Sequence, residues 1–278
     1  MMADEGFVLQ GLKQANLAAY LSVLYQPAEF RRAIAAIWAF DAEIARIPHL
    51  VSEPMPGEIR IQWWRDLLKS GDNAGSGPLA RELIQAIIDH DLPREMLDSY
   101  LEARIFDLYQ DAMPNKSTLE GYLGETVSSL FLLSILCTGA QRSTELADAC
   151  GHAGMAMGLA KLLAENARFR ARQQVYLPAE FLNANLLERE SWLHEGPDSR
   201  HRAVIKLSID LAENHLEEAK QAIGALEQFL QPHFLQLACT SVLLKKLRAS
   251  GNSSFIQPVT LSPLSIYWRI FSAALRKN

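Results

Sequence analysis

Cysteine and histidine, the residues that most often build disulfides and metal sites, are few and scattered in this sequence of 278 residues. The three cysteines are Cys137, Cys150 and Cys239, and no two of them form a CxxC pair. Such a sparse, odd set is typical of a reducing compartment and argues against a disulfide framework. The seven histidines form neither an HExxH motif nor an i, i+4 pair, so we expect no zinc site. The sequence also has no P-loop, no GxGxxG motif after a strand and no GxSxG motif.

Strong charge and long apolar runs are missing as well. The net charge of −5 gives no electrostatic case for binding nucleic acid. The first ten residues, MMADEGFVLQ, lack the basic start and apolar core of a signal peptide. The longest run without charge, residues 126–141, is short for a membrane span and contains several hydroxyl groups, which favours a buried core helix. We therefore expect a soluble, cytoplasmic protein that can still contact a membrane surface.

What the sequence does contain is helical periodicity from end to end. Alternating strand patterns are absent, and Ala, Leu, Glu and Arg are frequent. Stretches rich in proline, glycine and serine separate the periodic segments. This pattern predicts one all-α domain over residues 1–278. The expected helices cover residues 9–23, 28–46, 56–69, 78–89, 93–110, 117–138, 144–170, 200–227, 231–249 and 263–276.

Two of these segments have a distinctive composition. Residues 126–138 are apolar on nearly all sides, which predicts a central helix enclosed by others. Residues 263–276 follow a plausible N-cap, Ser262, and end in basic residues. One face of this last helix carries four large apolar side chains, Leu264, Trp268, Phe271 and Leu275. Such a helix either packs on the domain or lies on a membrane surface.

The stretch WAFDAEIARIPH, residues 38–49, places a carboxylate on an apolar helical stripe. Asp41 shares this stripe with Phe30, Ile34, Ile37 and Ile44. A buried carboxylate without a partner is costly, so we expect Asp41 to be paired, with Lys161 or Arg31 as candidates. Pro48 disfavours helical backbone in the residue before it, which predicts that the helix ends near Arg46.

Several of these stretches occur in an order that resembles one known family. They are YLSVLYQPAEFRRAIAAIWAF (20–40), IRIQWWRDLL (59–68), LEGYLGETVSSLF (119–131), GHAGMAMGLAKLLAENARFRARQQVYLP (151–178) and LAENHLEEA (211–219). Together they resemble the squalene/phytoene synthase family, whose members are head-to-head prenyl synthases of the all-α isoprenoid-synthase fold. The similarity covers residues 20–220 well and the C-terminal helices loosely. Its most specific part is the helix that ends in VYLP, with Gly154 and Ala156 upstream.

The resemblance implies a site in which two acidic clusters hold magnesium ions that bind the substrate diphosphate. Counting from WAF places the first cluster at Ala45, Arg46 and His49. Counting back from VYLP places the second at Glu165, Arg168 and Phe169. Only Glu165 among these six positions is a carboxylate, so we expect no bound metal and no magnesium-dependent ionisation of a prenyl diphosphate. The expected remnant of the site consists of Asp41, Ala45, Arg46, His49, Gly158, Lys161, Glu165, Arg168 and Phe169.

The resemblance also suggests a cavity wall, formed by Tyr20, Trp38, Tyr122 and His215. Two readings of the cations in the remnant stay open. Arg46, Lys161 and Arg168 either hold an anionic head group without magnesium, or pair with neighbouring carboxylates and solvent.

The stretches AFDAEIA and ARFRARQQVYLP look like one branch of the family, the mitochondrial complex I assembly factor. That resemblance implies a non-catalytic protein working near an inner membrane. We therefore expect a catalytically degenerate protein that binds an isoprenoid or lipid, or assists assembly of a respiratory complex. Its expected partners are such a ligand, a membrane surface contacted through residues 263–276, and a protein; no cofactor is expected. The alternatives are an active prenyltransferase with a non-standard magnesium site, and a helical interaction module with a filled cavity.

Overall fold

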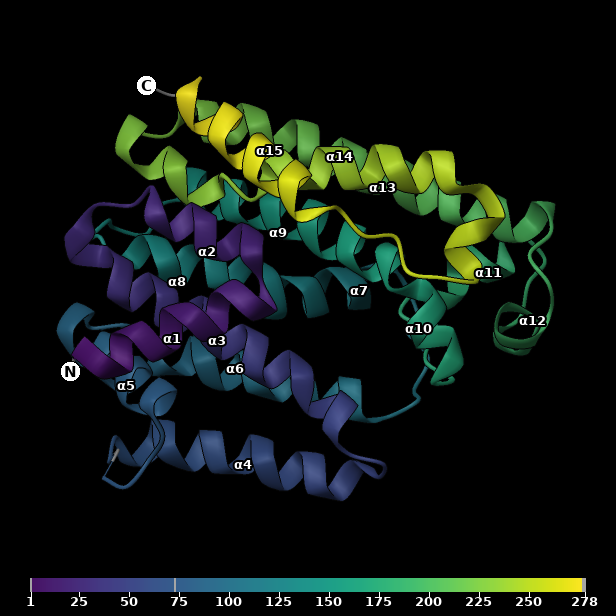
Figure 1. Ribbon diagram of the computed structural model, residues 1–278. Helices are drawn as coiled ribbons and strands as arrows, with labels where there is room; N and C mark the ends of the chain where they lie inside the picture. Colours follow the sequence, from purple (N-terminus) through teal and green to yellow (C-terminus); the bar gives the residue numbers. More distant parts are fainter. Residues whose placement is uncertain (1, 73, 277–278) are drawn as a thin grey trace.

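The computed structural model describes residues 2–72 and 74–276, and this part of the chain is built from helices (Figure 1). Within it, the only strand-like pairing is an isolated bridge between Ala112 and Val175. The all-α fold class predicted from the sequence is confirmed. The α-helices are α1 (Met2–Ala15), α2 (Leu17–Leu24), α3 (Ala28–Leu50), α4 (Pro54–Ser70), α5 (Pro78–His90), α6 (Arg94–Ile105), α7 (Lys116–Leu123), α8 (Ser129–Leu136), α9 (Thr144–Ala164), α10 (Asn166–Ala171), α11 (Ala179–Asn183), α12 (Arg189–His194), α13 (Ser199–Ala225), α14 (Leu237–Ser250) and α15 (Pro263–Leu275). Short 3₁₀ or π segments complete the path, namely η1 (Phe106–Leu108), η2 (Gly124–Ser128, a π-helix), η3 (Gln228–Phe234) and η4 (Gly251–Phe255).

Helix α9 lies in the interior of the bundle (Figure 1). It packs along α13 and also contacts α8, α14 and η2. Helix α3 packs against α1, α5 and α8, while α4 lies at one outer edge against α3 and α6. Helix α15 lies at the other edge of the view, where it contacts α2 and α14. These contacts hold the two long helices α3 and α9 inside the fold, where side chains of both line the same pocket.

The apolar segment at 126–138 forms part of the core, as its composition predicts. Four side chains of α8 are at most 1% exposed, namely Leu130, Phe131, Leu133 and Ile135. The continuous helical stretch Lys116–Leu136 is, among the described residues, the one long and apolar enough to cross a membrane. Because 67% of its apolar window is buried inside the fold, it is better explained as a core helix.

Several predicted helices are interrupted where local groups cap or deform them. The predicted helix 9–23 breaks at Asn16, whose side-chain oxygen accepts a hydrogen bond from the amide of Ala19 and starts α2. The predicted helix 117–138 contains the π-helical turn η2, and the predicted helix 144–170 is interrupted at Glu165. Two short helices, α11 and α12, occupy a segment for which the sequence pattern predicts none.

The prediction that Pro48 ends its helix near Arg46 is wrong. Helix α3 continues to Leu50 with Pro48 inside its last turn. Proline removes the amide that would bond to the carbonyl oxygen of Ile44, but only two further residues of α3 follow it, so one helical hydrogen bond is lost near the end of the helix. Ile47 and Pro48 are buried, and Arg172 donates a hydrogen bond of 2.6 Å to the carbonyl oxygen of Pro48. Tertiary contacts therefore hold the last turn helical, and position 49 does lie one turn beyond Ala45 on the same face.

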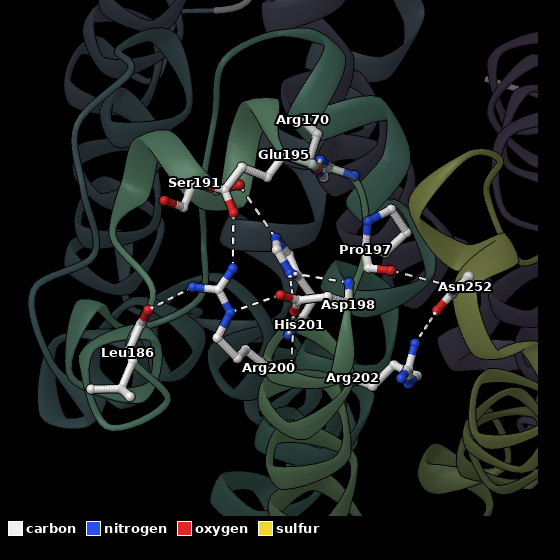
Figure 2. A network of polar contacts seen from close by, with 10 residues as sticks. All are labelled: Arg170, Leu186, Ser191, Glu195, Pro197, Asp198, Arg200, His201, Arg202 and Asn252. Carbon is white, nitrogen blue, oxygen red and sulfur yellow. Dashed lines mark hydrogen bonds and ion pairs between the residues drawn. The ribbon is translucent and has the colours of Figure 1, made fainter.

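A polar network fastens the segment around α12 to the start of α13 (Figure 2). Asp198 caps α13 by accepting hydrogen bonds from the backbone amides of Arg200 and His201, at 2.9 and 3.2 Å. The side chains of His201 and Arg200 also contact its carboxylate, and together they lower the pKa of Asp198 well below its usual range. Arg170 donates to two carbonyl oxygens at the end of α12. This corner is thus held by capping and charge-assisted hydrogen bonds.

His233 in η3 is a buried base without a hydrogen-bond partner. It is 3% exposed, and neither ring nitrogen has a partner among the described residues. Burial disfavours the imidazolium and lowers the pKa of His233 to about 4. In the unfolded chain the imidazole of His233 is protonated near pH 6.5, whereas in the folded chain it is protonated only near pH 4. Stability is therefore lost as the pH falls through this range, because the unfolded state binds more protons.

We expect the variant His233→Leu to remove this acid sensitivity. Between pH 7 and pH 5 the native chain should lose about 2 kcal/mol more unfolding free energy than the variant. Urea unfolding followed by circular dichroism at the two pH values measures the difference. The matched control is His194→Leu, at an exposed histidine of α12, which should keep the native acid sensitivity. Equal losses in His233→Leu and the native chain would contradict the assignment.

Candidate functional site

A pocket of about 210 Å³ lies between α3 and α9. The segment from α6 to η1, the segment from α7 to α8, and α10 close its remaining sides. Its wall combines polar residues that reach solvent, such as His49 and Arg172, with buried apolar residues, such as Trp38 and Leu130. The lining residues are Trp38, Asp41, Ala45, Pro48, His49, Arg104, Asp107, Tyr122, Leu123, Thr126, Val127, Leu130, Gly158, Lys161, Leu162, Glu165, Phe169, Arg172, Gln174 and Tyr176.

The structure brings most of the residues singled out in the sequence to this pocket. Those in the wall are Asp41, Ala45, His49, Gly158, Lys161, Glu165, Phe169, Trp38 and Tyr122. Arg46 and Arg168 are not in the wall; their side chains are 62% and 58% exposed. Arg46 approaches Glu43 at 3.8 Å and Arg168 pairs with Glu165 at 2.5 Å, so both take the ion-pair alternative.

Tyr20 and His215 do not belong to the cavity wall, and this prediction is wrong. Tyr20 is on α2, which packs against α3 and α15, and its ring lies under the ammonium of Lys13. His215 is on α13, and its Nδ1 lies 3.0 Å from Nδ1 of His152 on α9. Burial and the neighbouring His152 lower the pKa of His215. Both residues face helix contacts rather than the pocket.

Asp41 is paired, as its place on an apolar stripe predicts. It is 8% exposed, and its carboxylate accepts hydrogen bonds from the hydroxyl of Tyr100 at 2.8 Å and from Nη2 of Arg104 at 2.7 Å. The partner is therefore Arg104 and neither Lys161 nor Arg31. Arg31 instead donates to the carbonyl oxygen of Gln26.

Arg104 joins Asp41 to a second buried carboxylate, Asp107. Nη1 of Arg104 lies 3.1 Å from Asp107 Oδ2, and the hydroxyls of Tyr122 and Tyr176 each donate to Oδ1 at 2.7 Å. Burial opposes the charge of Arg104, but the surrounding tyrosines and carboxylates raise its pKa well above the usual value. Burial also raises the pKa values of Tyr122 and Tyr176, so both phenols remain hydrogen-bond donors. The network therefore links α3, α6, η1, α7 and the segment around Tyr176 through one guanidinium and two carboxylates.

The sequence interpretation missed Arg104, Asp107 and Tyr176. The signal that could have found Arg104 is a charged residue on an apolar helical stripe, as for Asp41. Arg104 lies on the side of α6 that also carries the buried residues Leu97 and Leu101. A positive and a negative residue on the apolar stripes of two packed helices are expected to pair, because the ion pair offsets the cost of burying each charge.

Lys161 differs from the other charges of the pocket because no group pairs with it. No hydrogen bond or ion pair joins its ammonium to any residue in the ranges 2–72 and 74–276 that the structure describes. Burial lowers the pKa of Lys161; the Asp41 carboxylate opposes this effect, and the Arg104 guanidinium adds to it. The wall of the pocket therefore contains a half-buried ammonium that has no hydrogen-bond partner in the described part of the chain.

The side chains in this pocket do not fit a magnesium site of the family type. Magnesium prefers oxygen ligands in octahedral geometry. The positions that match the first acidic cluster carry a methyl group, an outward guanidinium and an imidazole, at Ala45, Arg46 and His49. The single matching carboxylate, Glu165, is already paired with Arg168. Across the described part of the chain, no three His, Cys, Asp or Glu side chains are grouped to hold a metal.

Comparisons with known proteins agree on the family. Residues 12–265 match the family described as squalene/phytoene synthase. "NADH dehydrogenase (ubiquinone) complex I, assembly factor 6" of Rattus norvegicus is 30% identical over 272 residues, which covers 95% of this chain and 81% of the rat protein. Its homolog in Drosophila melanogaster is 27% identical over 263 residues, covering 90% and 78% of the two chains.

Solved structures show the same fold. A squalene synthase from Alicyclobacillus acidocaldarius superposes with a TM-score of 0.77 at 16% identity, covering 90% of this chain and 94% of the synthase. A dehydrosqualene synthase in complex with a ligand gives a TM-score of 0.80 at 15% identity, covering 99% and 96%. With its sequence matched over residues 12–265 and its helices arranged as in these synthases, the chain belongs to the squalene/phytoene synthase family.

Proposed function

We propose that this chain is a non-catalytic member of its family that assists the assembly of a respiratory membrane complex. The observation that carries the proposal is its similarity to complex I assembly factor 6, which extends over 95% of the chain. The pocket chemistry supports it, since the matching positions supply one carboxylate where the family's chemistry needs two acidic clusters.

The size of the pocket also favours this function over the prenyltransferase alternative. A head-to-head prenyl synthase has to accommodate two prenyl chains. The pocket has about 210 Å³, whereas ordinary ligand pockets have roughly 300–1,000 Å³. The walls leave too little space for two long substrates, while they do not close the pocket as a filled interaction module would require.

The outer face of α15 supports a peripheral position on a membrane. Ile270 and Ala274 are buried against the bundle, whereas an adjacent face of the helix is apolar and open to solvent. Its exposed fractions are 78% for Leu264, 62% for Trp268, 46% for Phe271 and 60% for Leu275. No acidic residue follows Glu227, although six Lys and Arg residues do, in a chain whose net charge is −5. An apolar, aromatic and acid-free surface suits the interface of a membrane that contains anionic lipids.

We expect the double variant Trp268→Ser/Phe271→Ser to bind vesicles of anionic lipid about tenfold more weakly than the native chain, or worse. Both side chains are exposed, so the fold should be retained. The matched control is Trp63→Ser on α4, where an aromatic side chain is 47% exposed on another face. Co-sedimentation with phosphatidylglycerol vesicles, compared with phosphatidylcholine vesicles, measures the effect. Equal binding by the double variant and the control would exclude α15 as the contact surface.

The assembly role is tested by deleting the gene in its own organism. We expect native gel electrophoresis of the membranes to show loss of fully assembled complex I, and restoration by the native gene. The purified chain should not consume farnesyl or geranylgeranyl diphosphate in the presence of magnesium. Normal complex I in the deletion strain, or turnover of either diphosphate, would overturn the proposal.

A further inference from the structure

We propose that the pocket between α3 and α9 binds a small organic anion directly through Lys161, without a metal ion. The ligand class is a molecule with one carboxylate or phosphate head group and a compact apolar body. The inference rests on the Lys161 ammonium, which lines the pocket without a hydrogen-bond or ion-pair partner among the described residues, and on the neighbouring cations Arg168 and Arg172; it does not depend on the proposed assembly role.

The charged side chains that line the pocket or pair with its lining are four cations, Arg104, Lys161, Arg168 and Arg172, and three carboxylates, Asp41, Asp107 and Glu165. Arg104 contacts both Asp41 and Asp107, at 2.7 and 3.1 Å, and the tyrosine hydroxyls fill further acceptor positions on the two carboxylates. Because these two carboxylates share one guanidinium, Lys161 supplies the second positive charge that formally balances them, and Arg172 is the cation left without a carboxylate partner among the described residues. The Lys161 ammonium makes no hydrogen bond within the described residues, so a carboxylate or phosphate of a ligand can accept one from it, and the single excess positive charge around the pocket favours an anion.

The mouth of the pocket also favours an anion. Arg172 and His49 line it, and Nη1 of Arg172 lies 3.0 Å from Nδ1 of His49. The carboxylate at the mouth, Glu165, is neutralised by Arg168 at 2.5 Å. Burial and the charges of Arg172 and Arg168 lower the pKa of His49, which is consistent with a positive potential at the entrance. An approaching anion therefore meets an excess of positive charge before it reaches Lys161.

The apolar part of the pocket wall defines the body of the ligand. Trp38, Leu123, Val127 and Leu130 present apolar surface there. At about 210 Å³ the pocket is smaller than ordinary ligand pockets, which begin at roughly 300 Å³, so its ligand has to be small. This space fits a compact group such as a phenyl ring or a branched five-carbon chain. It does not fit the long chain of a prenyl diphosphate.

Isothermal titration of the full chain, in buffer with a metal chelator, tests the proposal. The carboxylate probes are isovalerate and benzoate, and the phosphate probe is phenyl phosphate. The uncharged isosteres are isoamyl alcohol and benzyl alcohol. We expect at least one anion to bind, and its uncharged isostere to bind about tenfold more weakly or worse. Preference for benzoate over phenyl phosphate, or the reverse, identifies the head group.

The variant Lys161→Met keeps the length of the side chain and removes its charge. We expect it to weaken binding of the anion by about tenfold to a hundredfold. The matched control, Lys206→Met, removes an exposed lysine that pairs with Asp210 on α13 and should bind like the native chain. Val127→Phe narrows the apolar part of the pocket while Lys161 remains, and should also abolish binding. Circular dichroism verifies that each variant is folded.

Three results would overturn the inference. The first is that no small anion binds at millimolar concentration. The second is that Lys161→Met and the native chain bind the anion equally. The third is that farnesyl diphosphate binds only with magnesium and the small anions do not bind at all. Because none of these measurements involves a membrane or complex I, their outcome is separate from that of the assembly role.

Discussion

Replacing Arg104 by methionine should destabilise the fold by about 3–5 kcal/mol, the usual cost of removing one partner from a buried charge cluster. The side chains of Arg104, Asp41 and Asp107 are 13%, 11% and 6% exposed. Without the guanidinium, the two carboxylates keep only tyrosine hydroxyls as hydrogen-bond donors: that of Tyr100 to Asp41, and those of Tyr122 and Tyr176 to Asp107. Hydrogen bonds from phenols cannot replace a full positive charge, so the carboxylates have to take up protons or the cluster has to open to water.

Urea unfolding at pH 7 measures this loss. The matched control is Arg168→Met, which removes an arginine that is 58% exposed and pairs with Glu165, and should cost less than about 1 kcal/mol. A triple variant, Arg104→Met/Asp41→Asn/Asp107→Asn, should recover much of the stability because it removes all three charges together. If Arg104→Met unfolds at the same urea concentration as the control, the cluster does not hold α3 to α6.

The charge cluster shows how far the sequence could predict the site. The period of the helix placed Asp41 on an apolar stripe and required a partner, and this requirement depends only on local geometry and burial cost. The identity of the partner depends on which face of α6 meets α3, across 63 residues of chain. Helical periodicity shows which face of each helix is apolar, but it does not show which residues of α6 meet which residues of α3. Neither candidate named from the sequence is the partner: Lys161 forms no ion pair within the described residues, and Arg31 donates to the carbonyl oxygen of Gln26.

Helix boundaries were harder to predict for a related reason. Pro48 carries a strong local signal to end a helix, but Arg172, 124 residues later, supplies a hydrogen bond to its carbonyl oxygen. The π-helical turn η2 likewise forms next to Gly154 of α9. In both places a contact that is distant in sequence outweighs the local propensity. The all-α fold class could still be predicted, because it depends on helical periodicity over the whole chain and a few misplaced helix boundaries hardly change that periodicity.

Replacing Gly154 by alanine should destabilise the fold by about 3 kcal/mol, because η2 approaches α9 too closely to admit a methyl group. A Cβ atom at position 154 would lie 2.1 Å from Oγ of Ser128, and 2.6 and 2.7 Å from its backbone N and Cα. The hydroxyl can rotate away, but the backbone atoms cannot. Relief therefore requires η2 to move away from α9, which also weakens the hydrogen bond from Ser128 Oγ to the carbonyl oxygen of Gly151.

Gly151 offers a matched control in the same helix, one turn earlier. A Cβ atom there meets no heavy atom within 4 Å, so Gly151→Ala should stabilise the chain by about 0.5–1 kcal/mol through the backbone entropy of glycine. Urea unfolding of the two variants separates helix propensity, which they share, from the clash with Ser128. Thr126 and Val127 of η2 line the pocket, so Gly154→Ala should also displace that wall and weaken any ligand held by Lys161. If both variants gain stability equally, η2 yields to a methyl group, and α9 does not fix the position of this pocket wall.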